Sequence, residues 1–174
     1  MLRRPVPEDA AAIFERYASD PEVTRFLSWP RHHSIAATRD FVAFSDAEWA
    51  RAPAGPYLIA SRDGDRLLGS TGLSFQTGFR AETGYVLAVD AWGQGYAAEA
   101  LRAMLVVARS AGVVRVQALC HADHRRSHRV LEKCGFEREG LLRQYAEFPN
   151  LTTVPCDVVS YAITGVALLA AGNG

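Results

Sequence analysis

The chain has 174 residues, of which 49% are hydrophobic and 22% charged, and its 19 Lys and Arg residues balance 19 Asp and Glu residues. This composition is typical of one globular domain, 1–174, with a sizeable core. The balanced charge argues against a nucleic-acid or membrane partner. Three cysteines without a CxxC pair predict free thiols in a reducing compartment, with neither a disulfide framework nor a zinc site.

We expect no targeting or membrane segment. The opening MLRRPVPEDA lacks the apolar run of a signal peptide. The tail GVALLAAGNG, 165–174, is apolar but much shorter than the roughly 20 residues of a membrane-spanning helix. A cytoplasmic location is therefore expected.

The first third of the chain predicts two helices. Pro7, followed by Glu8 and Asp9, is typical of a helix start, because acidic groups favour the positive end of the helix dipole. Ser34 can cap a second helix. The apolar face of that helix follows three- and four-residue spacing through Ile35, Thr38, Phe41 and Val42.

The middle of the chain changes to strands and then to a helix. The segments 57–61 and 67–73 flank RDGDR and predict a hairpin around Asp63 and Gly64. A third strand is predicted over 81–89. The helix that follows, closed by Gly112, buries a face made of Leu101, Met104, Leu105 and Ala108.

The remaining elements alternate. VVRVQALC is predicted as a strand in which Val114, Val116 and Ala118 share one face. A short helix over 127–134 precedes Gly135. Two last strands, separated by a loop, are predicted over 136–142 and 156–163. The order indicates a mixed α/β domain whose central strand–helix–strand unit pairs in parallel.

Two glycines stand where the third strand passes into the long helix. Gly93-Gln94-Gly95-Tyr96-Ala97-Ala98 fits G-x-G-x-x-A, the pattern of dinucleotide-binding proteins. That fold needs an acidic residue at the end of the next strand, and VVRVQALC has none, which argues against it. The amides of 94–98 still point out of a helix N-terminus, so they can bind a phosphate. A plain tight turn is the alternative.

Four segments resemble, in order, the GNAT superfamily of N-acetyltransferases and its RimJ/RimL-type branch. WGQGYAAEAL resembles the family's pyrophosphate loop, Q/R-x-x-G-x-G/A, with Trp92 at the first position. SHRVLEKCGF resembles its second motif, a short helix that ends in Gly-Phe. DPEVTRFLSWP and GLLRQY…CDVVSYAI also look like this branch. The resemblance implies a mostly antiparallel central sheet with one splayed parallel strand pair and helices on both faces.

The resemblance also implies acetyl-CoA as co-substrate, bound between the splayed strands, and no metal. Backbone groups near Leu87, Ala88 and Val89 would hold the pantetheine arm and polarise the thioester carbonyl. The pyrophosphate would be held by the amides of Gly93, Gln94, Gly95, Tyr96, Ala97 and Ala98.

Two residues are predicted to be catalytic. Glu82, in a segment that resembles the branch's E-x-G-Y, is the first candidate for the base that takes a proton from the amine, and a solvated carboxylate is the alternative. Asp157 and Glu147 are weaker candidates. Many relatives protonate the thiolate with a tyrosine where this chain has Leu131. Ser127, one turn earlier, resembles a serine thought to face the sulfur, and a capping hydroxyl is its alternative.

Histidines and arginines gather just before the short helix. His124 stands where the branch usually has the Asn that binds the cofactor arm, and it could bind that arm through a ring nitrogen or be a surface histidine. The basic run HADHRRSHR could meet the 3′-phosphate of CoA or be solvated. His32 and His33 have no partners at metal-ligand spacing and are expected in a loop near the acceptor entrance.

We therefore expect an enzyme that acetylates a primary amine by direct attack in a ternary complex. The acceptor is a protein N-terminus or a small-molecule amine, and a homodimer stays open. Its site is expected between the early helices and the loop 143–155, with lining residues Arg143, Tyr145, Trp29 and Phe26. The alternative is a non-catalytic acyl-CoA-binding or sensing domain of the same fold, which would bind the cofactor without turnover.

Overall fold

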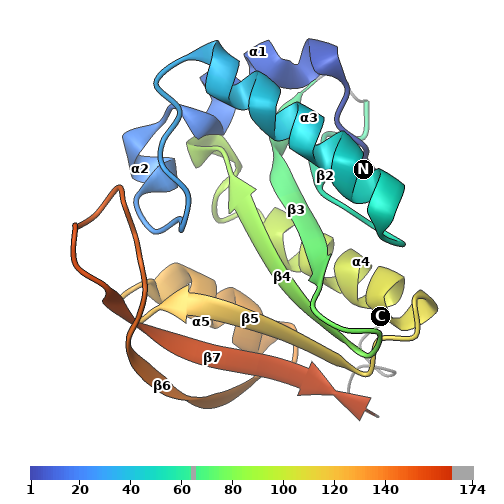
Figure 1. Ribbon diagram of the computed structural model, residues 1–174, viewed down its shortest axis with the longest axis vertical. Coiled ribbons are helices and arrows are strands. Elements are labelled where there is room, and N and C mark those ends of the chain that lie inside the picture. Colours follow the sequence, from blue (N-terminus) through green and yellow to red (C-terminus); the bar gives the residue numbers. More distant parts are fainter. Residues whose placement is uncertain (64–65, 166–174) are drawn as a thin grey trace.

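A seven-stranded sheet forms the centre of the computed structural model, which describes residues 1–63 and 66–165 (Figure 1). Gly64 of the predicted hairpin turn and the tail from 166 lie outside the described residues. The strand order is β1-β2-β3-β4-β5-β7-β6. The strands are β1 Leu2–Arg3, β2 Tyr57–Ala60, β3 Leu67–Phe75, β4 Arg80–Leu87, β5 Arg115–His121, β6 Glu137–Ala146 and β7 Cys156–Thr164.

The centre of the sheet contains the predicted parallel pair, β4 and β5. These strands pair only from Arg80 opposite Arg115 to Glu82 opposite Gln117. Beyond Glu82, β4 continues beside β3 and β5 continues beside β7, so the two strands diverge (Figure 1). All other neighbouring strands that the structure describes run antiparallel.

Helices cover both faces of the sheet, as predicted (Figure 1). On one face lie α4 Tyr96–Ser110 and α5 Arg125–Lys133. The other face carries the elements η1 Pro7–Asp9, α1 Ala10–Ile13, η2 Phe14–Ala18, α2 Pro21–Thr24 and α3 Ile35–Arg51. Because side chains of a strand alternate, Ala81 of β4 packs with the α4 cluster and Val86 with the cluster under α1 and α3.

The long helix α4 anchors the core as the sequence predicts. Leu101, Met104, Leu105 and Ala108 are all 0% exposed. Burying one such leucine or methionine contributes about 1.5–3 kcal/mol, so this face dominates the attachment of α4 to the sheet. The helix ends before Gly112, whose φ of +78° suits glycine.

Two of the three expected helix starts are confirmed. Pro7 begins the first helical segment, although that segment is a succession of 3-10, α and π turns. Ser34 is the N-cap of α3, although its side chain makes no capping bond. The short helix α5 begins at Arg125, two residues before the predicted start, because the amide of Ser127 already donates to the carbonyl of His124.

Two strand boundaries also differ from the prediction. Val114 is 54% exposed and precedes β5, since its amide bonds the carbonyl of Phe79 in the β3–β4 turn. Strand β6 extends past the predicted end at 142, because its pairing with β7 continues to Ala146 opposite Cys156. No helix within the described ranges is long and apolar enough to cross a membrane.

Candidate active site

A cavity of about 470 Å³ opens where β4 and β5 diverge. It is lined by residues of α3, β3, β4, β5 and α5, and by the loops that follow α2 and β6. This volume suits a small molecule or the reactive end of a larger one. The divergence of two strands therefore supplies space in the middle of a sheet that would otherwise be filled by ladder hydrogen bonds.

The N-terminus of α4 follows the end of β4 directly. Gly93 and Gly95 have φ values of +74° and +87°, and a Cβ at either position would meet no atom within 4 Å. The backbone conformation, not a lack of space, therefore requires glycine. The first bond of the helix joins the Glu99 amide to the Gly95 carbonyl, so the preceding amides have no partner within the helix. Such amides and the helix dipole favour an anion.

Some of the backbone amides and carbonyls between β4 and this loop already have hydrogen-bond partners. The Ala88 amide donates to the Leu68 carbonyl at 2.8 Å, and the Trp92 indole Nε1 donates to the Leu87 carbonyl at 2.8 Å. The Val89 carbonyl accepts from the Trp92 amide. Since neighbouring strand residues direct their amides to opposite edges, the Leu87 amide faces the β5 side. Trp92 thus fixes the loop, and Arg126 of α5 lies 4.6 Å above its ring.

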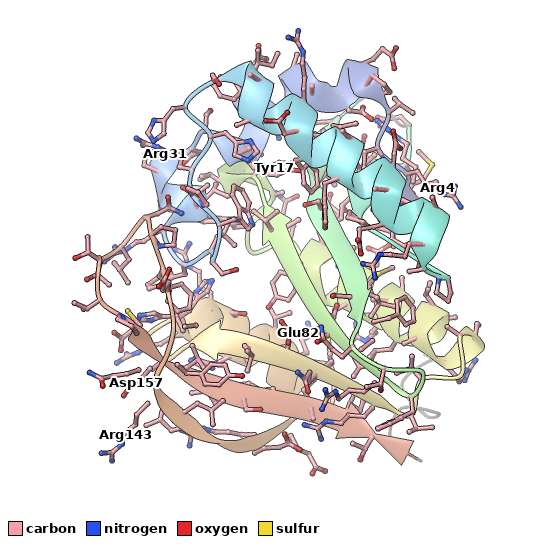
Figure 2. The ribbon with its side chains drawn as sticks, in the orientation of Figure 1. Arg4, Tyr17, Arg31, Glu82, Arg143 and Asp157 are labelled. Carbon is pink, nitrogen blue, oxygen red and sulfur yellow. The ribbon has the colours of Figure 1, made fainter. Side chains whose placement is uncertain are left out.

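Glu82 is the last residue of β4 that pairs with β5, and it lines the cavity. Figure 2 shows its side chain near the middle of the molecule, whereas Asp157 lies at the outer edge. Glu82 is half-buried, and Gln117 Nε2 donates to its Oε2 at 3.0 Å. The weaker candidates lie elsewhere: Asp157 accepts the amide of Gln144, and Glu147 is exposed outside the cavity lining. The second oxygen of Glu82 can accept a proton inside the cavity.

Ser127 lies in the first turn of α5 and also lines the cavity. Its Oγ is 2.9 Å from the hydroxyl of Tyr85 on β4. Burial raises the pKa of Tyr85, so this hydroxyl stays protonated and can donate. The alternative that Ser127 caps the helix is wrong, since His124 occupies the capping position. Tyr85 was not predicted as a site residue, although it follows Glu82 by three residues in E-T-G-Y.

An aromatic cluster closes one end of the cavity. The ring of His124 stacks on Phe26 with centroids 4.7 Å apart and an interplanar angle of 21°. His121 lies 4.9 Å from Phe26 and meets Phe148 edge-on at 4.8 Å. These contacts join the segment after α2, the segment after β5 and the β6–β7 loop. His124 is thus half-buried in a packed cluster rather than a free surface side chain.

Asn150 ties two of these segments together through backbone groups. Its Nδ2 donates to the carbonyls of Thr24 and Trp29, each at 2.8 Å, and its Oδ1 accepts the Arg31 amide at 2.7 Å. No sequence pattern marks Asn150 as a site residue. Because one amide satisfies three backbone groups, the β6–β7 loop and the segment 24–31 form one wall of the cavity.

The expected acceptor wall is correct in part. Phe26 and Trp29 line the cavity as predicted. From the predicted loop 143–155, Phe148 also lines it. Arg143 and Tyr145 do not, because both are exposed residues of the extended strand β6 (Figure 2 shows Arg143 at the edge). In the part of the chain that the structure describes, no group of three metal-ligating side chains comes together.

Comparison with known proteins agrees with this geometry. The model of the acetyltransferase (GNAT) domain matches residues 1–137. The chain belongs to the GNAT family of acetyltransferases. It is 33% identical over 166 residues to the uncharacterized N-acetyltransferase YoaA of Bacillus subtilis, covering 94% of this chain and 92% of that protein.

Solved structures share this GNAT fold. A GNAT-family acetyltransferase from Bacillus anthracis superposes with a TM-score of 0.81 at 26% identity, covering 94% of this chain and 93% of that one. RimL, a ribosomal L7/L12 alpha-N-protein acetyltransferase solved with coenzyme A, gives a TM-score of 0.83 at 24% identity, covering 95% and 94%. The mixed α/β sheet with one parallel pair is therefore the GNAT architecture.

Replacing Asn150 tests the cavity wall. Asn150→Ala leaves three backbone groups without their partner, so the free energy of unfolding should fall by about 1–3 kcal/mol in urea titrations. Thr153→Ala changes an exposed residue of the same loop and should leave stability unaltered. Equal stabilities of the two variants would contradict the role assigned to Asn150.

The protonation of His124 gives a second test. Burial, with the nearby His128, His121 and Arg126, lowers the pKa of His124 from 6.5 to about 4. The folded state therefore binds a proton at His124 less readily than the unfolded chain does. As the pH drops from 6.5 towards 4, the unfolded chain takes up that proton first, so the free energy of unfolding falls. In an NMR titration the ring should stay neutral until the pH approaches 4.

The variant Phe26→Ala provides the comparison for this titration. It removes the ring that covers His124, so the pKa should rise towards 6.5. A midpoint near 6.5 in the unaltered protein would show that the stacked, buried ring does not exist in solution.

Proposed function

We propose that the protein is an acetyl-CoA-dependent N-acetyltransferase of the RimJ/RimL type that acetylates a primary amine in a ternary complex. One observation carries the proposal: the diverging strands lead from an anion-binding helix N-terminus to a cavity that contains Glu82 and Ser127. The similarity to RimL supports the branch. Free cysteines, two of them buried, fit a cytoplasmic location.

The residues present fit acetyl-CoA. The amides of 93–98 would hold the pyrophosphate, and the open space beside Gly93 and Gly95 admits it to the backbone. The Leu87 amide, directed into the gap between the strands, would polarise the thioester carbonyl. Arg126, stacked on Trp92 beside the loop, adds positive charge near the phosphates. Acetyl-CoA supplies the activated acetyl group.

Glu82 and Ser127 would act on opposite sides of the transfer. Glu82 takes the proton that converts the ammonium group to the free amine. The amine nitrogen forms the new C–N bond as the C–S bond breaks, and the proton it then releases passes to the departing sulfur through the Ser127 hydroxyl, which Tyr85 holds in position. The site therefore provides a base and an acid without a covalent enzyme intermediate.

Titration calorimetry with acetyl-CoA tests cofactor binding. We expect a Kd of about 1–10 μM, and no binding of NADH as a matched control. Gln94→Glu should weaken binding about tenfold, because it places a negative charge beside the phosphate site. The same change also removes the bond that Gln94 Nε2 donates to the Asp90 carbonyl at 2.6 Å, so the free energy of unfolding is measured alongside the affinity.

Gln76→Glu is the matched control for charge, since Gln76 is an exposed residue of the β3–β4 turn. Equal affinity of both variants would exclude the α4 N-terminus as the phosphate site. Tight acetyl-CoA binding without acetylation of any amine would instead support the sensing domain.

The pH dependence of turnover separates the two catalytic roles. Glu82→Gln should lower kcat/KM by about 10²–10⁴-fold near neutral pH, and less at high pH, where the free amine needs no base. Ser127→Ala should lower kcat across the pH range, because the departing sulfur loses the hydroxyl that donates to it. Glu137→Gln changes an exposed glutamate of β6 and is the control. If Glu82→Gln lowered kcat/KM by the same factor at every pH, Glu82 would not be the base.

A further inference from the structure

The half of the cavity that faces α3 is strongly aromatic. Phe26, Trp29, Phe41, Phe44 and Phe148 all line it, from α3 and two loops. Trp29 and Phe41 are half-buried against the apolar cluster beneath α1 and α3. Phe44 is 54% exposed and forms part of the rim. Hydrophobic side chains of this size are costly to leave in water unless an apolar ligand covers them.

The opposite side of the same space is flat and made of small residues. Gly72 of β3 lies opposite Gly84 of β4, and Ser70 and Ser74 stand on the same strand face as Gly72. A Cβ at Gly84 would meet nothing within 4 Å. A Cβ at Gly72 would meet Pro56 Cα at 3.2 Å, so the open part of the floor is the gap at Gly84, between Glu82 and Val86 on the same strand face, and this gap suits a flat ring.

The charge of the lining is negative. Among lining side chains in the described part of the chain, the carboxyl groups are those of Glu48 and Glu82, and burial lowers the pKa of both lining histidines, His121 and His124. Glu48 is paired with Arg51, an exposed residue of the same helix, at 2.5 Å. Figure 2 shows Glu82 near the centre of the molecule, with Arg4, Arg31 and Arg143 at its periphery. The site can thus compensate an ammonium group beside Glu82, whereas the cation packed against a lining side chain, the exposed Arg25, lies 5.3 Å from the centroid of the Phe26 ring.

We propose that the acceptor is an arylalkylamine, a primary amine that a short alkyl chain joins to an aromatic ring and that carries no carboxylate. This inference rests on the proposed function. The ammonium group approaches Glu82, which takes its proton. The ring lies between the floor around Gly84 and the aromatic side chains of α3 and the loops. A free amino acid would leave its carboxylate without a partner beside Glu82.

An acceptor panel with the full chain and saturating acetyl-CoA tests the inference. Phenylalanine differs from phenethylamine by its carboxylate, and butylamine lacks the ring. We expect kcat/KM for phenethylamine to exceed that for phenylalanine by about 100-fold and that for butylamine by about tenfold. Spermidine and a peptide with a free N-terminus complete the panel. A higher kcat/KM for either, or for phenylalanine, would overturn the acceptor class and leave the acetyltransferase intact.

Two variants localise the ring. Gly84→Val fills the floor and should reduce kcat/KM for phenethylamine much more than for butylamine, with unchanged affinity for acetyl-CoA. Gly140→Val, at a β6 glycine whose Cβ also meets nothing within 4 Å, is its control. Phe44→Ala should raise the KM for phenethylamine about fivefold, since the ring loses an aromatic contact. Phe79→Ala changes a similarly exposed phenylalanine outside the cavity and should have no effect.

The failures are distinguishable. Acetyl-CoA binding without acetylation of any amine would overturn the proposed function and the acceptor class with it. If phenethylamine were preferred but Gly84→Val and Gly140→Val changed its kcat/KM equally, the ring would not lie over Gly84.

Discussion

The site depends on one constraint: every backbone amide and carbonyl of a buried strand needs a partner. When β4 and β5 part after Glu82 and Gln117, their facing edges lose the ladder that a parallel pair would provide. Part of the deficit is met internally, by the Trp92 indole at the Leu87 carbonyl. The rest can be met by water or by a ligand with its own hydrogen-bonding groups along its length. The acetyl-CoA proposed above has such groups in its extended, amide-containing arm, so it would meet this need.

A second constraint keeps the gap open on the acceptor side. The segment after α2 and the β6–β7 loop belong to no strand of the sheet, and only single backbone bonds, such as Leu27 to Thr24 and Leu151 to Phe148, brace them. Asn150 and the contacts among Phe26, His121 and Phe148 join the two segments to the rest of the cavity wall. The cavity therefore has one wall made by a sheet and another made by side chains that join two loops.

Much of the fold follows from patterns that are local in sequence. The strand predicted over 81–89 and the spacing of Leu101, Met104 and Leu105 each act within a few residues, and both predictions are confirmed. Gly93 and Gly95 have the positive φ that favours glycine, and the phosphate site there stays a prediction. The errors concern features decided by distant partners. Strand β6 reaches Ala146 because β7 offers pairing there, and the start of α5 is fixed by His124 although its sequence has no capping signal.

The same distinction applies to the site. Glu82 and Ser127 could be assigned because they lie in segments that resemble a family's motifs, and the structure brings both to one cavity. Tyr85 and Asn150 could not, because their roles depend on contacts across 42 and about 120 residues of sequence. A tyrosine in a strand and an asparagine in a loop have common structural explanations, so only the folded chain distinguishes them.

The bonds of Asn150 have a consequence for how such proteins diverge. All three reach main-chain atoms of the segment 24–31, and none reaches a side chain. A change of side chain at 29 leaves those bonds in place, so part of the surface that faces the acceptor can change while the backbone of the wall keeps its position. One half-buried amide thus lets the acceptor surface vary at that position without rebuilding the site.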